Sequence, residues 1–201
     1  MSASHPTPPA ATSEPAPPER RAFALRDALV DRGLVEAGEA EALAHRAAEE
    51  LSPANGARVV AKAWVDPGFR QRLLANATAA AKELGIEGPE GRQMVVVENT
   101  ATTHNAIVCT QCSCTAWPLL GLPPDWYKAP PYRARVVREA RALLAEMGLQ
   151  LPATTNIRVW DTSGETRYFV LPMRPQGTEH LSEEQLAGLV TRDALIGVAR
   201  I

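Results

Sequence analysis

The run Met94-Val95-Val96-Val97 marks a change in the character of the chain. Four consecutive apolar residues, three of them β-branched, are typical of a strand buried in a sheet. Strand patterns return at Ile157–Trp160 and Arg167–Leu171. Asp161-Thr-Ser-Gly164 lies between these two runs and predicts a hairpin turn. Downstream of residue 88, the chain is therefore expected to contain a sheet.

The sequence upstream of that run carries helical rather than strand patterns. Leu25, Leu29 and Arg32 follow the spacing of one helix face, and Gly33 stands where such a helix should end. Asp66 followed by Pro67 is a typical helix start. The expected landmarks are helices over 25–32, about 35–51, 66–84, 132–147 and 182–190, with a turn at Pro53 and Asn55-Gly56.

These patterns predict three parts. Residues 1–20 are rich in proline, lack the features of a secretory signal and are expected to form a disordered tail. Residues 21–87 are expected to form an N-terminal helical arm. Residues 88–201 are expected to form a mixed α/β domain. The predicted fold class is therefore α+β or α/β, with the helical arm preceding a mixed α/β domain that carries all three cysteines.

Composition limits the classes of function. The chain has 201 residues, 45% of them hydrophobic and 22% charged, with a formal net charge of -2. This balance is typical of a globular protein and gives no electrostatic reason to expect nucleic acid or an anionic membrane as partner. No apolar stretch is long enough to span a membrane. The clustering of all three cysteines favours a reducing cytoplasm over a disulfide framework.

The three cysteines, Cys109, Cys112 and Cys114, fall within six residues. A structural zinc site needs a fourth ligand that the neighbourhood lacks, and a redox Cys-x-x-Cys pair would leave Cys114 unexplained. A disulfide between Cys112 and Cys114 would close a very tight loop. Spacing alone leaves zinc, redox and an unusual metal site open.

The Cys112-Ser113-Cys114 segment is well suited to chelation. The backbone nitrogen and the sulfur of Cys114 close a five-membered ring on a metal ion, and the nitrogen of Ser113 with the sulfur of Cys112 closes a six-membered ring. Cys109 can return its sulfur to an axial position, which leaves a sixth position open for water or substrate. Because ionised backbone amides require a strongly Lewis-acidic ion, this arrangement favours a trivalent metal.

The run VCTQCSCTAWPLLGLPPDWYK, residues 108–128, resembles the nitrile hydratase α subunit, as do VVVENT upstream and RVWDTSGETRYFVLPMRPQGTE downstream. The resemblance extends from about Arg21 to Val198. It implies hydration of a nitrile to an amide at a metal bound by Cys109, Cys112, Ser113 and Cys114. It also implies that Cys112 is a sulfinic acid and Cys114 a sulfenic acid, which acts as nucleophile or base.

The same resemblance indicates the metal and the substrate pocket. Thr110 after the first cysteine implies Co(III), whereas Thr-Ala-Trp-Pro after the cluster is equally similar to the Fe(III) branch. Trp117 and Glu90 are expected to line the pocket, with Glu90 replacing the glutamine common in the family. The alternatives are the metal subunit of thiocyanate hydrolase, which resembles this chain but has arginine in place of Trp117, and a non-catalytic zinc or redox module.

A β-type partner subunit is the last expectation. Two oxidised cysteines, a thiolate and two ionised amides exceed the charge of a trivalent ion, and guanidinium groups suit that excess. The resemblance implies that partner arginines supply them, while Arg133 and Arg135 are the alternative within this chain. A structural role is the first expectation for the remaining candidates, which are Trp126, Tyr127, Arg133, Arg167, a hydrogen-bonded His104 and a turn residue Asp161.

Overall fold

The structure is a computed structural model that describes residues 17–87, 92–112 and 114–201. The contacts divide the chain into two compact units, residues 1–47 and 48–201, and each is described by itself. Most of the predicted tail, residues 1–16, lies outside the described part. Residues 17–20 form the first turn of a helix. The boundary expected near residue 87 reflects a change in composition, whereas the contacts divide the chain at Ala47.

The first unit holds helix α1, Pro17–Asp31, and most of helix α2, Glu39–Glu50. Gly33 follows α1 with a φ of 66°, a left-handed conformation that glycine adopts without steric cost. The guanidinium of Arg26 lies 2.5 Å from the carboxylate of Glu41 and so connects the two helices. Both predicted helices are confirmed, although the second begins later than expected.

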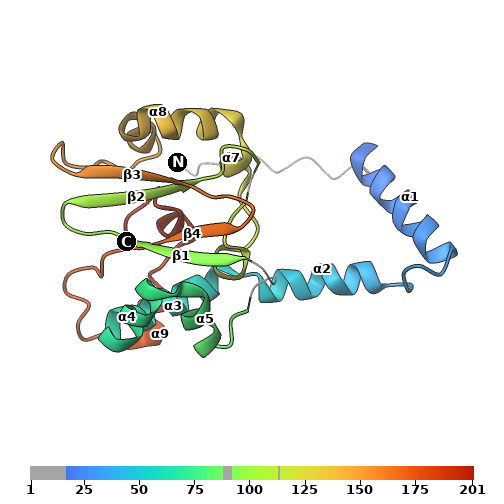
Figure 1. Cartoon of the computed structure of the whole chain (residues 1–201), viewed down its shortest axis with the longest axis horizontal. Helices are drawn as coiled ribbons and strands as arrows, with labels where there is room; N and C mark the ends of the chain where they lie inside the picture. Colours follow the sequence, from blue (N-terminus) through green and yellow to red (C-terminus); the bar gives the residue numbers. More distant parts are fainter. Residues whose placement is uncertain (1–16, 88–91, 113) are drawn as a thin grey trace, which may run out of the picture. The chain divides into compact units, whose positions relative to one another are not determined.

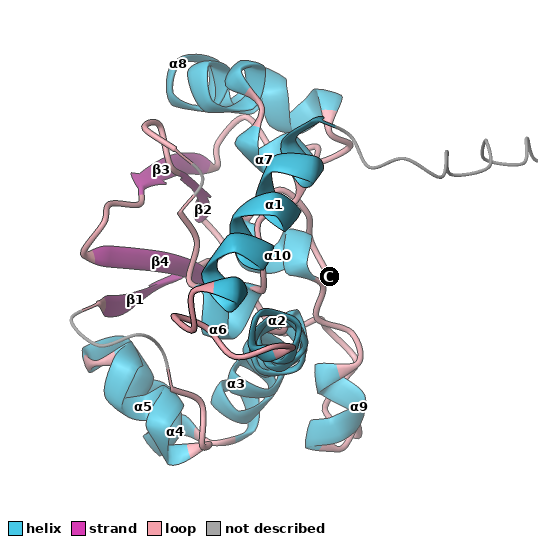
Figure 2. Cartoon of the chain, turned by 90° about the vertical axis from the view of Figure 1, so that its right-hand side faces the viewer, coloured by secondary structure: helices cyan, strands magenta, loops and turns pink. Residues whose placement is uncertain are grey.

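Four strands form two parallel pairs in the second unit (Figure 2). Strand β1, Gln93–Glu98, pairs with β4, Thr166–Leu171, and β2, Thr103–Val108, pairs with β3, Asn156–Asp161. The predicted hairpin between β3 and β4 is wrong, because the turn between them leads from one pair to the other. Strand β2 was not expected, since its buried polar residues hide the apolar pattern.

Helices cover the strands on two sides (Figure 1). Helix α8 lies beside β3, helices α4 and α5 lie beside β1, and α3 packs against α4. The core between them includes Ile107, Leu119, Leu144 and Phe169, all fully buried. The helices of this unit are α3 Pro53–Val65, α4 Pro67–Ala75, α5 Ala77–Glu83, α6 Trp117–Leu120, α7 Asp125–Lys128, α8 Pro130–Glu146, α9 Glu183–Ala187 and α10 Arg192–Ile196.

Two predictions for these helices need correction. The turn expected at Pro53 and Asn55-Gly56 is wrong, because Ser52 caps α3 and all three residues belong to that helix. A side chain at Gly56 would meet the carbonyl oxygen of Leu119 at 2.3 Å, so glycine there permits close packing on α6. The helix expected over 66–84 is two helices, since the side chain of Asn76 caps α5.

Three predicted helix features are confirmed. Asp66 caps α4, and Ser182 with Gln185 forms the capping box of α9, which ends at Ala187 rather than Val190. Helix α8 matches the periodicity seen in the sequence and bends at Glu139, whose φ is -139°. Among the described residues, no helix combines the length and apolar character needed to cross a membrane.

Candidate metal centre

The three cysteines follow the carboxyl end of β2. Cys109 is 1% exposed, Cys112 is exposed and Cys114 is half-buried. The sulfur of Cys112 lies 3.4 Å from that of Cys109 and 3.0 Å from that of Cys114. All three sulfur atoms lie within 4.8 Å of one another, and no other group of three potential ligands occurs in the described part of the chain. One ion could therefore contact all three sulfurs.

Asp161 fixes the start of the cysteine loop, residues 109–114. It is the last residue of β3 and lies opposite Val108 in the strand pairing. Its carboxylate accepts one hydrogen bond from the backbone nitrogen of Thr110 at 3.0 Å and another from the Thr110 hydroxyl at 2.5 Å. The interpretation of Asp161 as a turn residue missed this contact. The strand pairing that brings Asp161 to the loop left no signal in the sequence.

Aromatic residues of α7 and α8 support the last residue of the loop and the strand that precedes the loop. The Tyr127 hydroxyl donates to the carbonyl oxygen of Cys114 at 3.0 Å, and the Tyr132 hydroxyl donates to that of Ile107 at 2.7 Å. Trp126 packs edge-on against Tyr132. Burial raises the pKa of both tyrosines well above the usual range, so both hydroxyls stay protonated and can donate.

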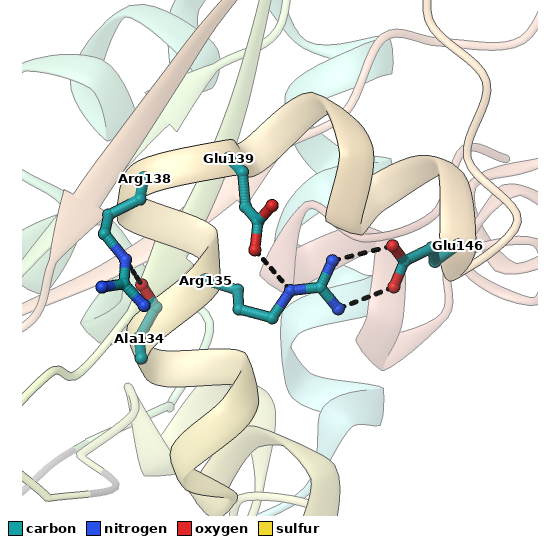
Figure 3. A network of polar contacts seen from close by, with 5 residues as sticks. All are labelled: Ala134, Arg135, Arg138, Glu139 and Glu146. Carbon is teal, nitrogen blue, oxygen red and sulfur yellow. Dashed lines mark hydrogen bonds and ion pairs between the residues drawn. The ribbon is translucent and has the colours of Figure 1, made fainter.

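Of the two arginines considered from the sequence, only Arg133 contacts the loop. Its Nη1 donates to the carbonyl oxygen of Cys112 at 3.1 Å. Arg135 instead binds Glu139 and Glu146 on its own helix (Figure 3). Arg167 is 5% exposed, and its Nε and Nη1 have no hydrogen-bond partner among the described residues. Tyr127 and Arg133 thus support the loop, whereas Arg167 has no such contact.

The two expected pocket residues differ in what the structure describes. Trp117 begins α6 and is half-buried, with the guanidinium carbon of Arg92 5.4 Å from the centre of its ring. Its indole nitrogen is buried without a hydrogen-bond partner in the described part of the chain. Glu90 lies outside the described residues, as does Ser113. Their expected roles stay predictions.

His104 lies at the opposite end of β2 and not in the candidate site. Its Nε2 lies 2.8 Å from the carbonyl oxygen of Gly197, and its Nδ1 lies 3.3 Å from the amide nitrogen of Asn99. Because a carbonyl oxygen can only accept, Nε2 carries the proton and Nδ1 accepts. Burial lowers the pKa of His104, although the bond to Gly197 opposes this shift. The expected structural role is confirmed.

The fold and this site define an α/β protein with a cluster of three cysteines at a strand end that could hold a metal ion. Residues 16–199 match the family model described as nitrile hydratase, alpha chain. The chain therefore belongs to the nitrile hydratase α-chain family.

Individual relatives agree with this assignment. The low-molecular weight cobalt-containing nitrile hydratase subunit alpha of Rhodococcus rhodochrous is 54% identical over 179 residues, which cover 89% of this chain and 86% of the relative. The thiocyanate hydrolase subunit gamma of Thiobacillus thioparus is 40% identical, with 88% and 77% covered. A solved structure of the Fe-type nitrile hydratase from Comamonas testosteroni Ni1, a double mutant, matches with a TM-score of 0.88 and 49% identity, covering 94% of this chain and 92% of its own.

Proposed function

We propose that this chain is the metal-bearing α subunit of a nitrile hydratase, which adds water across a carbon–nitrogen triple bond to give an amide. The observation that carries this proposal is the convergence of three cysteine sulfurs within 4.8 Å at the end of β2, in a chain of this family. The gathering of Cys109, Cys112 and Cys114 fits a metal that prefers thiolate ligands.

The proposed ligands are the sulfurs of Cys109, Cys112 and Cys114 and the backbone nitrogens of Ser113 and Cys114. Cys112 is proposed to be a sulfinic acid and Cys114 a sulfenic acid. Bound there, a trivalent ion supplies Lewis acidity toward the nitrile or toward water. The proposed role of the Cys114 sulfenate oxygen is to attack the nitrile carbon or to accept a proton from water. Trp117 and Glu90 are proposed to line the substrate pocket.

The proposed metal is Co(III). Thr110 and the similarity to cobalt-containing relatives support cobalt, whereas the match to an Fe-type structure keeps Fe(III) as the alternative. Expression in iron-rich, cobalt-free medium is expected to give a nearly inactive enzyme, and cobalt is expected to restore activity. Equal activity of iron-loaded and cobalt-loaded protein would refute this choice.

A β-type partner subunit is proposed to close the site and to direct arginines toward the cysteine oxygens. The first unit supports a need for a partner, because α1 has no buried residue and Leu25 and Leu43 are 63% and 60% exposed. We propose that the arm of residues 21–87 contributes to this contact. We also propose a cytoplasmic location, because a reducing compartment keeps clustered cysteines as free thiols until a metal binds.

The test of the function is an assay of the cobalt-loaded chain with and without its β-type partner, on a nitrile and on thiocyanate. We expect amide formation from the nitrile only with the partner present. Turnover of thiocyanate without amide formation would instead assign the chain to thiocyanate hydrolysis, which the 40% identical relative makes the second candidate. A colourless, zinc-bound protein without either activity would indicate a structural or redox module.

A further inference from the structure

Arg133 is the cation that contacts the backbone of the cysteine loop. It lies in the first turn of α8, and its Nη1 donates to the carbonyl oxygen of Cys112 at 3.1 Å. That carbonyl carbon is bonded to the nitrogen of Ser113, which is one of the proposed metal ligands. Arg133 therefore holds the carbonyl group of Cys112, which directly precedes the proposed amide ligand.

The neighbouring cations are occupied elsewhere. Lys128 pairs with Asp125, and Arg135 pairs with Glu139 and Glu146. Arg138 donates to the carbonyl oxygen of Ala134 within its own helix (Figure 3). Within the described part of the chain, no carboxylate forms an ion pair with Arg133. No described carboxylate therefore neutralises the positive charge of Arg133, which lies beside the loop.

The surroundings of Arg133 indicate that the stability of the fold does not require an arginine at this position. Its Nε is buried and has no hydrogen-bond partner among the described residues. A buried donor without an acceptor costs free energy, so an apolar side chain of similar length would serve the fold at least as well. Arg133 also lines an open surface pocket of about 430 Å³, together with Thr110, Pro130, Ala134, Val137 and Arg138.

We propose that Arg133 is a positioning residue of the metal centre, supplied by this chain itself. It fixes the carbonyl group of Cys112 before the metal binds, and its permanent positive charge offsets part of the excess negative charge of the loaded site. The proposal rests on the proposed function, because it needs a metal bound by the loop. In this proposal, arginines of the partner subunit contact the oxygens on the cysteine sulfurs, and Arg133 contacts the backbone of the loop.

The test compares the full-length variants Arg133→Gln and Arg133→Lys with Arg138→Gln, a control on the same helix. Cobalt content and the visible absorption of the thiolate-bound ion are followed after addition of cobalt. We expect Arg133→Gln to take up cobalt on the order of ten-fold less readily. Arg133→Lys should recover part of this loss, because it keeps the charge, and Arg138→Gln should match the unchanged chain.

Two further measurements separate positioning from a fold defect. Thermal unfolding should differ little between Arg133→Gln and the unchanged chain, because the guanidinium lacks a buried partner for its Nε. Hydrogen exchange of residues 109–114 in the metal-free chain should be faster in Arg133→Gln. If that variant does not fold, the same comparison is made with Arg133→Lys, which should exchange at an intermediate rate.

Equal cobalt uptake and equal hydrogen exchange in Arg133→Gln and the unchanged chain would overturn the proposal. A failure of the proposed function gives a different pattern, because then the unchanged chain itself would bind no cobalt or hydrate no nitrile. Hydrogen exchange would still decide whether Arg133 holds the loop in that case.

Discussion

The two ends of strand β2 differ in how their polar groups are bonded. At the amino end, the side-chain amide of Asn105 donates to the carbonyl oxygen of Glu98 at 2.7 Å and to Oδ1 of Asn99 at 3.1 Å, and its own oxygen accepts from Trp160 at 2.9 Å. At the carboxyl end, the cysteine sulfurs contact one another, while Asp161 and Arg133 hold only the surrounding backbone and Thr110.

We infer that the amino end of β2 contributes to the stability of the fold and that the loop after its carboxyl end serves the proposed function. Paired, buried polar groups at the amino end strengthen the fold, because each group would be costly to bury alone. Asp161 and Arg133 hold the loop at the carboxyl end through its backbone and through Thr110, and neither contacts a cysteine sulfur. Changes at the first end should therefore reduce stability, and changes at the second should reduce metal binding while leaving the fold intact.

The largest effect on stability is expected from Gly197→Ala at the amino end. A Cβ atom there would meet the carbonyl oxygen of Asn105 at 2.0 Å, and Gly197 has a φ of 88°. Both the clash and the backbone strain act against the folded state, so the free energy of unfolding should fall by roughly 3 kcal/mol or more. Urea unfolding of the metal-free chain measures this loss.

Gly148→Ala is the matched control, because its φ is 92° but a Cβ atom would meet nothing within 4 Å. Only the strain remains there, and a loss of about 1 kcal/mol is expected. If the two substitutions were equally destabilising, the close approach at Gly197 would not matter to the fold.

Loss of the Thr110–Asp161 contact should affect the metal more than the fold. Thr110→Val keeps the shape of the side chain but removes the hydroxyl that Asp161 accepts from, and Asp161→Asn removes the charge. Each change should lower cobalt affinity on the order of ten-fold. The free energy of unfolding should change by less than about 1 kcal/mol, because both residues are exposed.

Thr110→Ser keeps the hydroxyl and serves as the control, with cobalt uptake close to that of the unchanged chain. The double substitution Thr110→Val with Asp161→Asn should be little worse than either alone, since both changes weaken the same hydrogen-bonded pair. Fully additive losses would show that the two residues act separately.

The smallest effect is a pH dependence at the amino end of β2. Burial lowers the pKa of His104, and its charged neighbour Arg200 lowers it further. Its contribution to stability is therefore complete above the unfolded pKa of about 6.5 and is lost as the pH falls toward the lower folded value. Comparing urea unfolding of the unchanged chain and His104→Gln between pH 7.5 and 5.5 isolates this slope, which should be weaker in the variant.

Local patterns predicted most helices and three strands. Strands β1 and β4 contain continuous runs of apolar and aromatic residues, and β3 is rich in such residues despite Arg158. The caps Asp66 and Ser182 carry their signal in neighbouring residues. Strand β2 was missed because His104 and Asn105 are polar yet buried by partners far away in the sequence. The prediction of a hairpin was wrong for a similar reason, since strand pairing depends on contacts between distant residues and not on the local turn sequence.

The cysteine loop could be predicted because its three cysteines lie close together in the sequence. Its supports were not assigned, because Asp161 reaches the loop through the pairing of β2 with β3, and Arg133 and Tyr127 reach it from helices. The excess negative charge expected at the site made both Arg133 and Arg135 candidates. Only the structure separates them, since Arg135 is bound by two carboxylates on its own helix.

The most direct test of the account is metal analysis together with intact mass of the chain purified with its partner. The account predicts one cobalt ion bound per chain, two oxygens added to Cys112 and one added to Cys114. Cys112→Ala should lose the metal and the activity together, because the cluster then keeps only two sulfurs. Full cobalt content in Cys112→Ala, or an active complex with unmodified cysteines, would contradict the three-cysteine centre proposed for this chain.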